Sequence, residues 1–267
     1  MSKTILFSDL DGTFLDHQSY APARDAWKML EASDVPLVFC SSKTFAEQTA
    51  LQYELGMRCP FIFENGSAIA LPRGYFPADF YSPQRTAGDW DLLVLSHAGR
   101  EELFSLMTDY PELTGFSHAD DHRLAEATGL KNEALARACD RWFTETLLSP
   151  KDDAGLAPLR GRFLQEGWMF SRGGRFFTLQ SAAADKGKAL KRLLQLFQQQ
   201  WPASELRVVA VGDSLNDAPM LAAAGLPFLL QSYGGNWVDM DIPGLVRVAA
   251  NGPAGFSEVV RRILQIA

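Results

Sequence analysis

Hydrophobic residues in the first third of the chain alternate between short continuous runs and helical stripes. The runs cover residues 4–8, 37–40 and 61–63, and the stripes cover residues 21–33 and 44–55. A short continuous run is typical of a strand buried on both faces, and a stripe at helical spacing is typical of an amphipathic helix. Strands that alternate with helices predict parallel strands joined by crossovers, which form a doubly wound α/β sheet.

The last third of the chain, after residue 184, returns to the same alternation. The expected helices cover residues 186–199, 218–224 and 256–266, and the expected strands cover residues 206–211 and 227–230. Ligands of such sheets bind outside the carboxyl ends of the strands, so polar residues that follow these runs are candidates for a site.

The middle of the chain has a different pattern, and it begins with turn-rich segments at residues 71–74 and 81–83. The expected helices there cover residues 99–107, 131–141 and 156–167, and the expected strands cover residues 91–96, 143–149, 168–171 and 175–181. The segment from Arg172 to Gly174 is typical of a hairpin turn. We therefore expect a doubly wound, mostly parallel α/β core over residues 1–82 and 184–267, with an α+β cap domain over residues 83–183 inserted into it.

Composition narrows the classes of function. Hydrophobic residues make up 47% of the 267 residues and charged residues 21%, as in ordinary globular proteins. The chain has no apolar run of about 18 residues and no basic leader with a cleavage site, so we expect a cytoplasmic protein without a membrane span. The net charge of −7 disfavours nucleic acid as a partner, and an anionic substrate would need a local cationic pocket.

Neither the cysteines nor the histidines predict a metal site. Cys40, Cys59 and Cys139 are widely spaced and form neither an even disulfide set nor a metal-binding pattern. His118 and His122 lie in a polar segment that lacks supporting ligands, so an exposed loop is expected there.

Polar residues follow several of the expected strands. Asp9, Ser41, Asn65 and Asp213 each come just after an apolar run, so a parallel sheet would bring them to one edge. Asp9 and Asp11 would share a face if the strand continued to its end. Two close carboxylates repel each other unless a proton or a cation lies between them, and Mg²⁺ prefers such oxygen ligands. The alternative interpretation is an ordinary Asp-Gly turn after a strand.

Four segments together resemble the motifs of the haloacid dehalogenase superfamily of phosphohydrolases. They are residues 4–13, residues 35–43, residues 185–188, which begin a helix at Lys186, and residues 208–217. The resemblance covers nearly the whole chain and implies a large cap inserted after the third core strand. The segments that are more similar to one family, the mannosyl-3-phosphoglycerate phosphatases, are residues 39–44, 60–66, 143–147, 173–176 and 251–256.

The resemblance implies a role for each acid and for one lysine. Asp9 would be the nucleophile that forms an aspartyl-phosphate. Asp11 would be the general acid for the leaving oxygen and then the base for water. Lys186 would bind the phosphate and keep Asp9 ionised. Mg²⁺ would be held by Asp9 and Asp213 through carboxylates and by Asp11 through its backbone carbonyl, while Asp217 would hold metal-bound water or Lys186.

The same resemblance implies contacts with the phosphate and with the rest of the substrate. The expected residues are Ser41, Ser42, Lys43, Asn65 and Asn216 in the core, and Gly174 and Arg175 in the cap. With Arg172, the cap hairpin would bind a substrate carboxylate through guanidinium and backbone N–H groups. The alternatives are that Ser41 and Ser42 only cap the following helix, and that the hairpin is a solvated surface turn.

The function implied by the resemblance is a magnesium-dependent phosphatase of a small anionic phosphosugar. The cap segments favour mannosyl-3-phosphoglycerate or glucosyl-3-phosphoglycerate as the substrate. The alternatives are a phosphatase of other sugar phosphates, a phosphomutase on the same core, and a non-catalytic regulatory protein. The presence of every acid and cation of the four motifs argues against the last of these.

Overall fold

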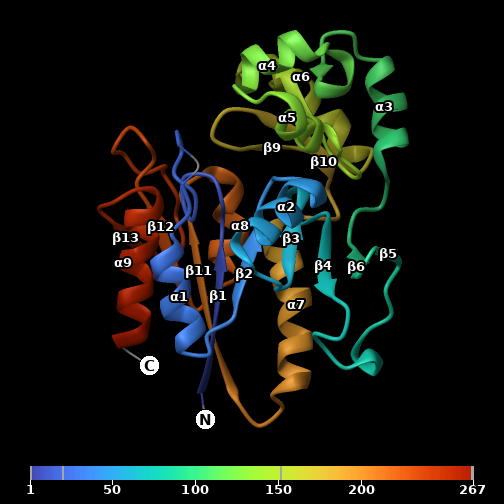
Figure 1. The fold of residues 1–267 in the computed structure, drawn as a ribbon. Helices are drawn as coiled ribbons and strands as arrows, with labels where there is room; N and C mark the ends of the chain where they lie inside the picture. Colours follow the sequence, from blue (N-terminus) through green and yellow to red (C-terminus); the bar gives the residue numbers. More distant parts are fainter. Residues whose placement is uncertain (1, 20, 151, 266–267) are drawn as a thin grey trace.

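The computed structural model describes residues 2–19, 21–150 and 152–265, and its strands form two separate sheets (Figure 1). The larger sheet has nine strands in the order β13-β12-β11-β1-β2-β3-β4-β6-β5. They are β1 (Ser2–Ser8), β2 (Leu37–Cys40), β3 (Phe61–Phe63), β4 (Ala68–Pro72), β5 (Arg85–Ala87), β6 (Trp90–Val94), β11 (Glu205–Gly212), β12 (Leu226–Leu230) and β13 (Val246–Val248). Neighbours from β13 to β3 pair in parallel, and β4, β6 and β5 add antiparallel pairs at one edge. The predicted mostly parallel α/β core is therefore confirmed.

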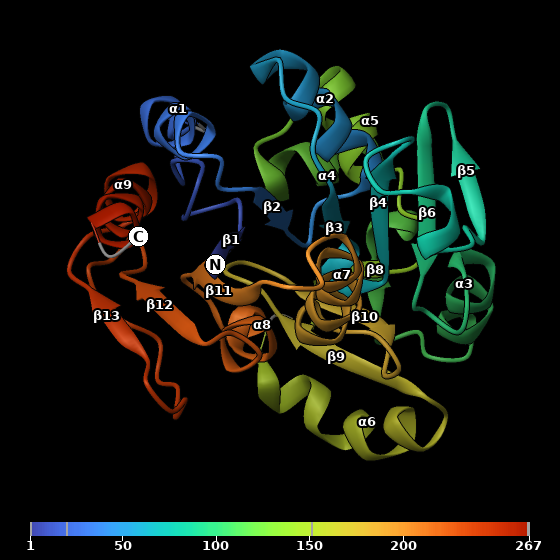
Figure 2. The same cartoon turned by 90° about the horizontal axis from the view of Figure 1, so that it is seen from below.

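Helices cover both faces of the large sheet (Figure 2). They are α1 (Arg24–Ala32), α2 (Phe45–Leu55) and α9 (Gly252–Gln265) on one face, and α7 (Lys186–Gln200) and α8 (Ala218–Ala222) on the other. Successive strand residues point to opposite faces, so in β1 Leu6 packs toward the first group, and Ile5 and Phe7 toward the second. None of the helices in the described residues is long and apolar enough to cross a membrane.

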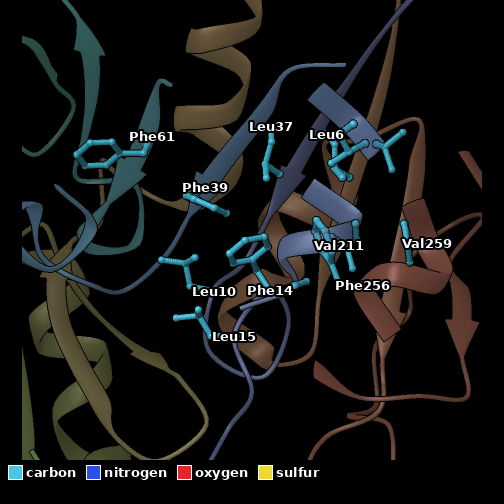
Figure 3. Packing of buried hydrophobic residues seen from close by; sticks show 14 of the residues in the cluster. Leu6, Leu10, Phe14, Leu15, Leu37, Phe39, Phe61, Val211, Phe256 and Val259 are labelled. Carbon is cyan, nitrogen blue, oxygen red and sulfur yellow. The ribbon is translucent and has the colours of Figure 1, made fainter. Parts of the chain in front are cut away.

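The cluster beneath α1 and α9 fixes the loop that follows β1 (Figure 3). Phe14 of this loop is fully buried, with its ring centroid 4.8 Å from that of Phe39 and 5.3 Å from that of Phe256. Leu10 and Leu15 belong to the same cluster. The loop is thus held on both sides of the acidic positions 9 and 11.

The smaller sheet belongs to a cap that lies over the carboxyl ends of the parallel strands (Figure 1). Its strands, in the order β7-β8-β10-β9, are β7 (Thr114–Gly115), β8 (Glu145–Ser149), β10 (Phe177–Ser181) and β9 (Trp168–Arg172), and all their pairs are antiparallel. Its helices are α3 (Arg100–Thr108), α4 (Asp121–Thr128), α5 (Asn132–Cys139) and α6 (Asp153–Gln165). The inserted α+β cap predicted from the sequence is present.

Two parts of the sequence prediction differ from the structure. Strands β5 and β6 lie in the range 83–183 expected for the cap, but they pair through β4 with the large sheet, so we propose that the cap begins after Val94. The polar segment around His118 and His122 is not all loop, because the Asp120 side chain accepts a hydrogen bond from the Arg123 N–H and begins α4.

Candidate active site

Two aspartates meet where the neighbouring parallel strands β1 and β11 end. Asp9 follows β1, and its N–H donates to the Val211 carbonyl at 2.9 Å. Carboxylate oxygens of Asp9, Asp213 and Asp217 lie within 4.8 Å of one another, and all three residues are buried. Gly12 permits this approach, because a Cβ there would lie 2.6 Å from Asp213 Oδ2, and its φ of +81° also favours glycine.

One buried lysine neutralises part of this acidic cluster. Lys186 is the first residue of α7, directly after the N-cap Asp185. Its Nζ donates to Asp9 Oδ1 at 2.7 Å and to Asp217 Oδ1 at 2.6 Å. The other oxygen of Asp217 accepts the N–H groups of Asp213 and Ser214, both at 3.0 Å. Asp217 therefore fixes both the lysine and the loop that carries Asp213.

The charges of the cluster are not balanced by the protein. Burial, followed by repulsion from Asp217, raises the pKa of Asp9 to about 7 despite the attraction of Lys186. Burial and repulsion from Asp9 and Asp217 also raise the pKa of Asp213. Burial alone would lower the pKa of Lys186, but the two aspartates outweigh it and raise that pKa. The cluster thus has more negative than positive groups.

The residues fit a hard divalent cation. Asp213 Oδ1 is buried and has no hydrogen-bond partner among the described residues. An unpartnered buried carboxylate oxygen beside a second carboxylate is the arrangement that a divalent cation relieves. Asp9 and Asp213 can supply oxygen ligands, whereas both oxygens of Asp217 are already engaged by hydrogen-bond donors.

Asp11 lies apart from this cluster and faces a second lysine. The Nζ of Lys43 is 3.1 Å from Asp11 Oδ2 and 3.3 Å from Glu47 Oε1. Burial would lower the pKa of Lys43, but Asp11 and Glu47 outweigh it and raise that pKa. Glu47 is itself fixed, because with Thr44 it forms the capping box of α2. The structure therefore places Asp11 beside a cation at the start of a helix.

The other core residues expected at the phosphate form a connected set. The Asn65 N–H donates to the Ser41 carbonyl at 3.0 Å, and the Asn216 Nδ2 donates to Asn65 Oδ1 at 3.0 Å. Asn65 Nδ2 in turn donates to Ser171 Oγ of the cap at 3.3 Å. Ser42 and Asn216 line the cavity described next, whereas Ser41 and Asn65 are buried.

A cavity of about 130 Å³ lies between the core and the cap. Its core end contains Asp9, Asp11 and Asp213, and its cap wall contains Gly174 and Arg175 of the β9–β10 turn. Arg175 donates to the Thr128 carbonyl at 3.0 Å, and its guanidinium lies over the Phe176 ring. The turn thus brings the two predicted cap residues to the same cavity as the acids.

Arg172 does not join them, and the expectation that it faces the substrate is wrong. Its Nη1 lies 2.9 Å from Asp153 Oδ2 of α6, and its guanidinium lies over the Phe177 ring. Arg172 is the last residue of β9, three residues before Arg175, and it does not line the cavity. Its half-exposed side chain therefore contacts other residues of the cap and not the cavity.

Glu64 ties the core to the cap. Its carboxylate accepts hydrogen bonds from Trp142 N at 2.8 Å, Phe143 N at 2.9 Å and Thr144 Oγ1 at 2.7 Å. The residue is fully buried, and burial raises the pKa of this carboxyl despite the opposing attraction of Arg141. No sequence signal indicates this role of Glu64, because its partners lie about eighty residues away along the chain.

Comparison with known proteins agrees with this geometry. The family model described as haloacid dehalogenase-like hydrolase matches residues 6–78 and 151–232, which is more than half of the chain. The chain belongs to this hydrolase family. The predicted superfamily and the predicted enzyme class, a phosphoric monoester hydrolase, are therefore confirmed.

Two similar relatives of the chain carry the same name, glucosyl-3-phosphoglycerate/mannosyl-3-phosphoglycerate phosphatase. The protein from Methanococcoides burtonii is 32% identical, with 98% of this chain and 97% of that protein covered. The protein from Persephonella marina is 31% identical, with 97% of each chain covered. A solved haloacid dehalogenase-like hydrolase from B. subtilis is 18% identical with a TM-score of 0.68, covers 97% of this chain and 99% of its own, and supports the fold.

Proposed function

We propose that this haloacid dehalogenase-like hydrolase is a cytoplasmic, magnesium-dependent phosphatase of glucosyl-3-phosphoglycerate or mannosyl-3-phosphoglycerate. The observation that carries the chemistry is the buried Asp9 carboxylate, held at 2.7 Å by Lys186 on the wall of the cavity. The assignment of the substrate is supported by the names of two relatives that match almost the whole chain.

Asp9 acts as the nucleophile. Lys186 engages one of its oxygens and opposes the rise that burial causes in the pKa of this carboxyl. The carboxylate attacks phosphorus, the ester P–O bond breaks, and an aspartyl-phosphate forms. Asp217 holds Lys186 in place from the other side at 2.6 Å.

Asp11 moves the protons. It gives a proton to the oxygen of the leaving alcohol, and it then takes a proton from the water that hydrolyses the aspartyl-phosphate. The products are the alcohol and inorganic phosphate, and Asp9 is regenerated. Lys43, 3.1 Å from Asp11, fixes the orientation of that carboxyl group.

The ligands for Mg²⁺ are the carboxylates of Asp9 and Asp213 and the backbone carbonyl of Asp11. When bound, Mg²⁺ offsets the repulsion between the negatively charged carboxylate and the negatively charged phosphate monoester. The unpartnered Asp213 Oδ1 and the raised pKa of Asp213 support this assignment.

The remaining predicted residues bind the substrate. Ser42, Lys43 and Asn216 line the cavity beside Asp9, while Ser41 and Asn65 support them from behind. Gly174 and Arg175 form part of the cap wall that faces the organic part of the substrate.

The test is phosphate release by the purified protein with Mg²⁺. The substrates are glucosyl-3-phosphoglycerate, mannosyl-3-phosphoglycerate, glucose 6-phosphate and glucose 1-phosphate. We expect the two phosphoglycerates to be preferred, and activity to disappear on chelation and to return with Mg²⁺ but poorly with Ca²⁺. A preference for a plain hexose phosphate would refute the substrate assignment, transfer of phosphate between positions of a sugar would indicate a mutase, and full activity after exhaustive chelation would refute the metal.

A further inference from the structure

A second arginine, Arg141, lines the cavity together with Arg175, and the sequence prediction did not single it out. Arg141 lies between α5 and β8 in the cap, and the residue is only 8% exposed. Its Nη1 donates to Thr144 Oγ1 at 2.9 Å and to the carbonyl of Ser42, a core residue, at 3.3 Å. The guanidinium is therefore held at the junction of core and cap, next to the predicted phosphate contacts.

Among the described residues no carboxylate forms an ion pair with Arg141, although Glu47 and Glu64 attract it from nearby. Both partners of its Nη1 are neutral, and its buried Nε has no hydrogen-bond partner among the described residues. The nearby carboxylates are used elsewhere, since Glu64 accepts from Trp142, Phe143 and Thr144, and Glu47 pairs with Lys43. A buried guanidinium without a paired anion is costly, so a cavity wall of this kind is suited to an anionic ligand.

Two threonine hydroxyls accompany the guanidinium. Thr146 of β8 and Thr178 of β10 lie directly opposite each other in the cap sheet, and both line the cavity. Thr146 Oγ1 is buried and has no partner within the described part of the chain. Arg141 and Thr146 thus both line the cavity from the cap, and each has a buried donor without a partner among the described residues, of the kind that a carboxylate accepts.

We propose that Arg141, with Thr146, binds a carboxylate of the substrate, a second anionic group distinct from the phosphate that is transferred. This inference rests on the proposed function, because it assumes that the phosphate occupies the end of the cavity at Asp9. That end has its own cation, Lys186, and the oxygen ligands for a divalent ion. Arg141 and Thr146 both belong to the cap, which faces the part of the substrate that leaves.

Arg141 suits this role better than the hairpin arginine. Arg175 donates to the Thr128 carbonyl and lies over Phe176, so its guanidinium is engaged within the cap. Arg141 has a buried N–H that still lacks an acceptor. The carboxylate is therefore assigned to Arg141, and Arg175 to the remainder of the organic group.

The first experiment compares two phosphate esters that differ only in a carboxylate, 3-phosphoglycerate and glycerol 3-phosphate. We expect Arg141→Gln to lower kcat/KM for 3-phosphoglycerate about ten- to a hundredfold more than for glycerol 3-phosphate. Thr146→Val, which keeps shape and removes only the hydroxyl, should act in the same direction by about three- to tenfold. Arg172→Gln is the matched control, since its side chain does not line the cavity.

The second experiment measures binding calorimetrically. The probes are glucosylglycerate, which has the carboxylate but no phosphate, and inorganic phosphate. Arg141→Gln should weaken glucosylglycerate binding and leave inorganic phosphate within about twofold. Equal losses for both esters, or a loss confined to inorganic phosphate, would assign Arg141 to the transferred phosphate and overturn the proposal.

The two proposals fail separately. Suppose that the wild type does not hydrolyse glycosyl phosphoglycerates, but that it discriminates between the two small esters and that this discrimination depends on Arg141. The substrate assignment is then wrong, and the carboxylate site is supported. If the wild type hydrolyses glycosyl phosphoglycerates and Arg141→Gln changes neither discrimination nor glucosylglycerate binding, the proposed function stands and the carboxylate site is refuted.

Discussion

The core end and the cap wall of the cavity differ in the partners of their charged side chains. At the core end, Lys186 Nζ lies 2.7 Å from Asp9 and 2.6 Å from Asp217, so these three charges have charged partners, whereas Asp213 Oδ1 has no partner among the described residues. On the cap wall, both hydrogen bonds of Arg141 Nη1 run to neutral groups, the Thr144 hydroxyl and the Ser42 carbonyl. The core end thus holds fixed, paired charges together with an acidic position suited to a cation, whereas the guanidinium of Arg141 depends on what enters the cavity.

This difference separates the reaction from the choice of substrate. Groups that attack and protonate must have fixed positions and charges before the substrate arrives. Groups that select a substrate gain most when the ligand supplies their missing partner, because the wrong ligand then leaves a buried group unpaired. Changes at the core end should therefore affect all substrates alike, and changes on the cap wall should affect them differently.

The largest effect is expected from Asp9→Asn. The substitution keeps the volume of the side chain but removes the attacking charge, so phosphate release should fall by at least ~10³-fold, about 4 kcal/mol of transition-state stabilisation. The loss should be the same for every substrate. The measurement is kcat/KM on two substrates with a preparation checked for contaminating phosphatase, and a substantial residual turnover would refute the covalent mechanism.

The second effect concerns the pH dependence of Mg²⁺ binding. The pKa of Asp9 is raised to about 7 in the metal-free protein, so the carboxyl is mostly protonated below that pH and must lose its proton when a cation binds. Binding should weaken by up to about tenfold for each pH unit below 7 and release protons. Calorimetry at pH 5.5 and 8 in two buffers measures both quantities, and binding that is independent of pH would exclude Asp9 as the titrating ligand.

A smaller effect is expected on stability from Glu64→Gln. The two oxygens of Glu64 accept from Trp142 and Phe143, and an amide can accept through only one side, so a buried N–H loses its partner. The free energy of unfolding should fall by about 1–3 kcal/mol. Urea unfolding tests this value, with the exposed Glu126→Gln on α4 as the matched control. Equal unfolding midpoints for the two variants would show that the contacts of Glu64 between core and cap do not contribute to the free energy of unfolding.

The smallest effect is expected from the pair Arg175→Ala and Arg172→Ala. Arg175 lines the cavity and supports the turn through Thr128, so its loss should lower kcat/KM for a glycosyl phosphoglycerate about tenfold. Arg172 has an exposed ion pair with Asp153, and such pairs contribute little, so its loss should change kcat/KM less than twofold. If the two variants behave alike, the cavity wall at the hairpin does not contact the substrate.

The core end could be predicted because its residues follow strands. Asp9 and Asp213 come after apolar runs of two strands that pair in parallel, so the topology brings them together across about two hundred residues. Lys186 stands at a helix N-terminus, where a cation opposes the helix dipole and therefore indicates a functional reason. These features are local in the sequence, so they can be recognised without knowledge of the fold.

The cap wall could not be predicted in the same detail. Arg141 lies in a connection between α5 and β8, and its contact with Ser42 spans almost a hundred residues without a sequence signal. Arg172 and Arg175 are three residues apart, and only the actual turn, which is longer than the sequence indicated, shows that one faces the cavity and the other faces α6. The antiparallel edge strands β5 and β6 fall within the range expected for the cap, because the sequence of a short strand does not show which sheet it joins.

The bond between Asn65 and Ser171 has a consequence for the end of the catalytic cycle. Asn65 receives the Asn216 amide on one side and gives its own amide to the cap on the other. A cap that swings away must break this bond, and Asn65 then loses one of the two contacts that fix its side chain. Movement of the cap away from the core would therefore also loosen the side chain that supports the predicted phosphate contacts.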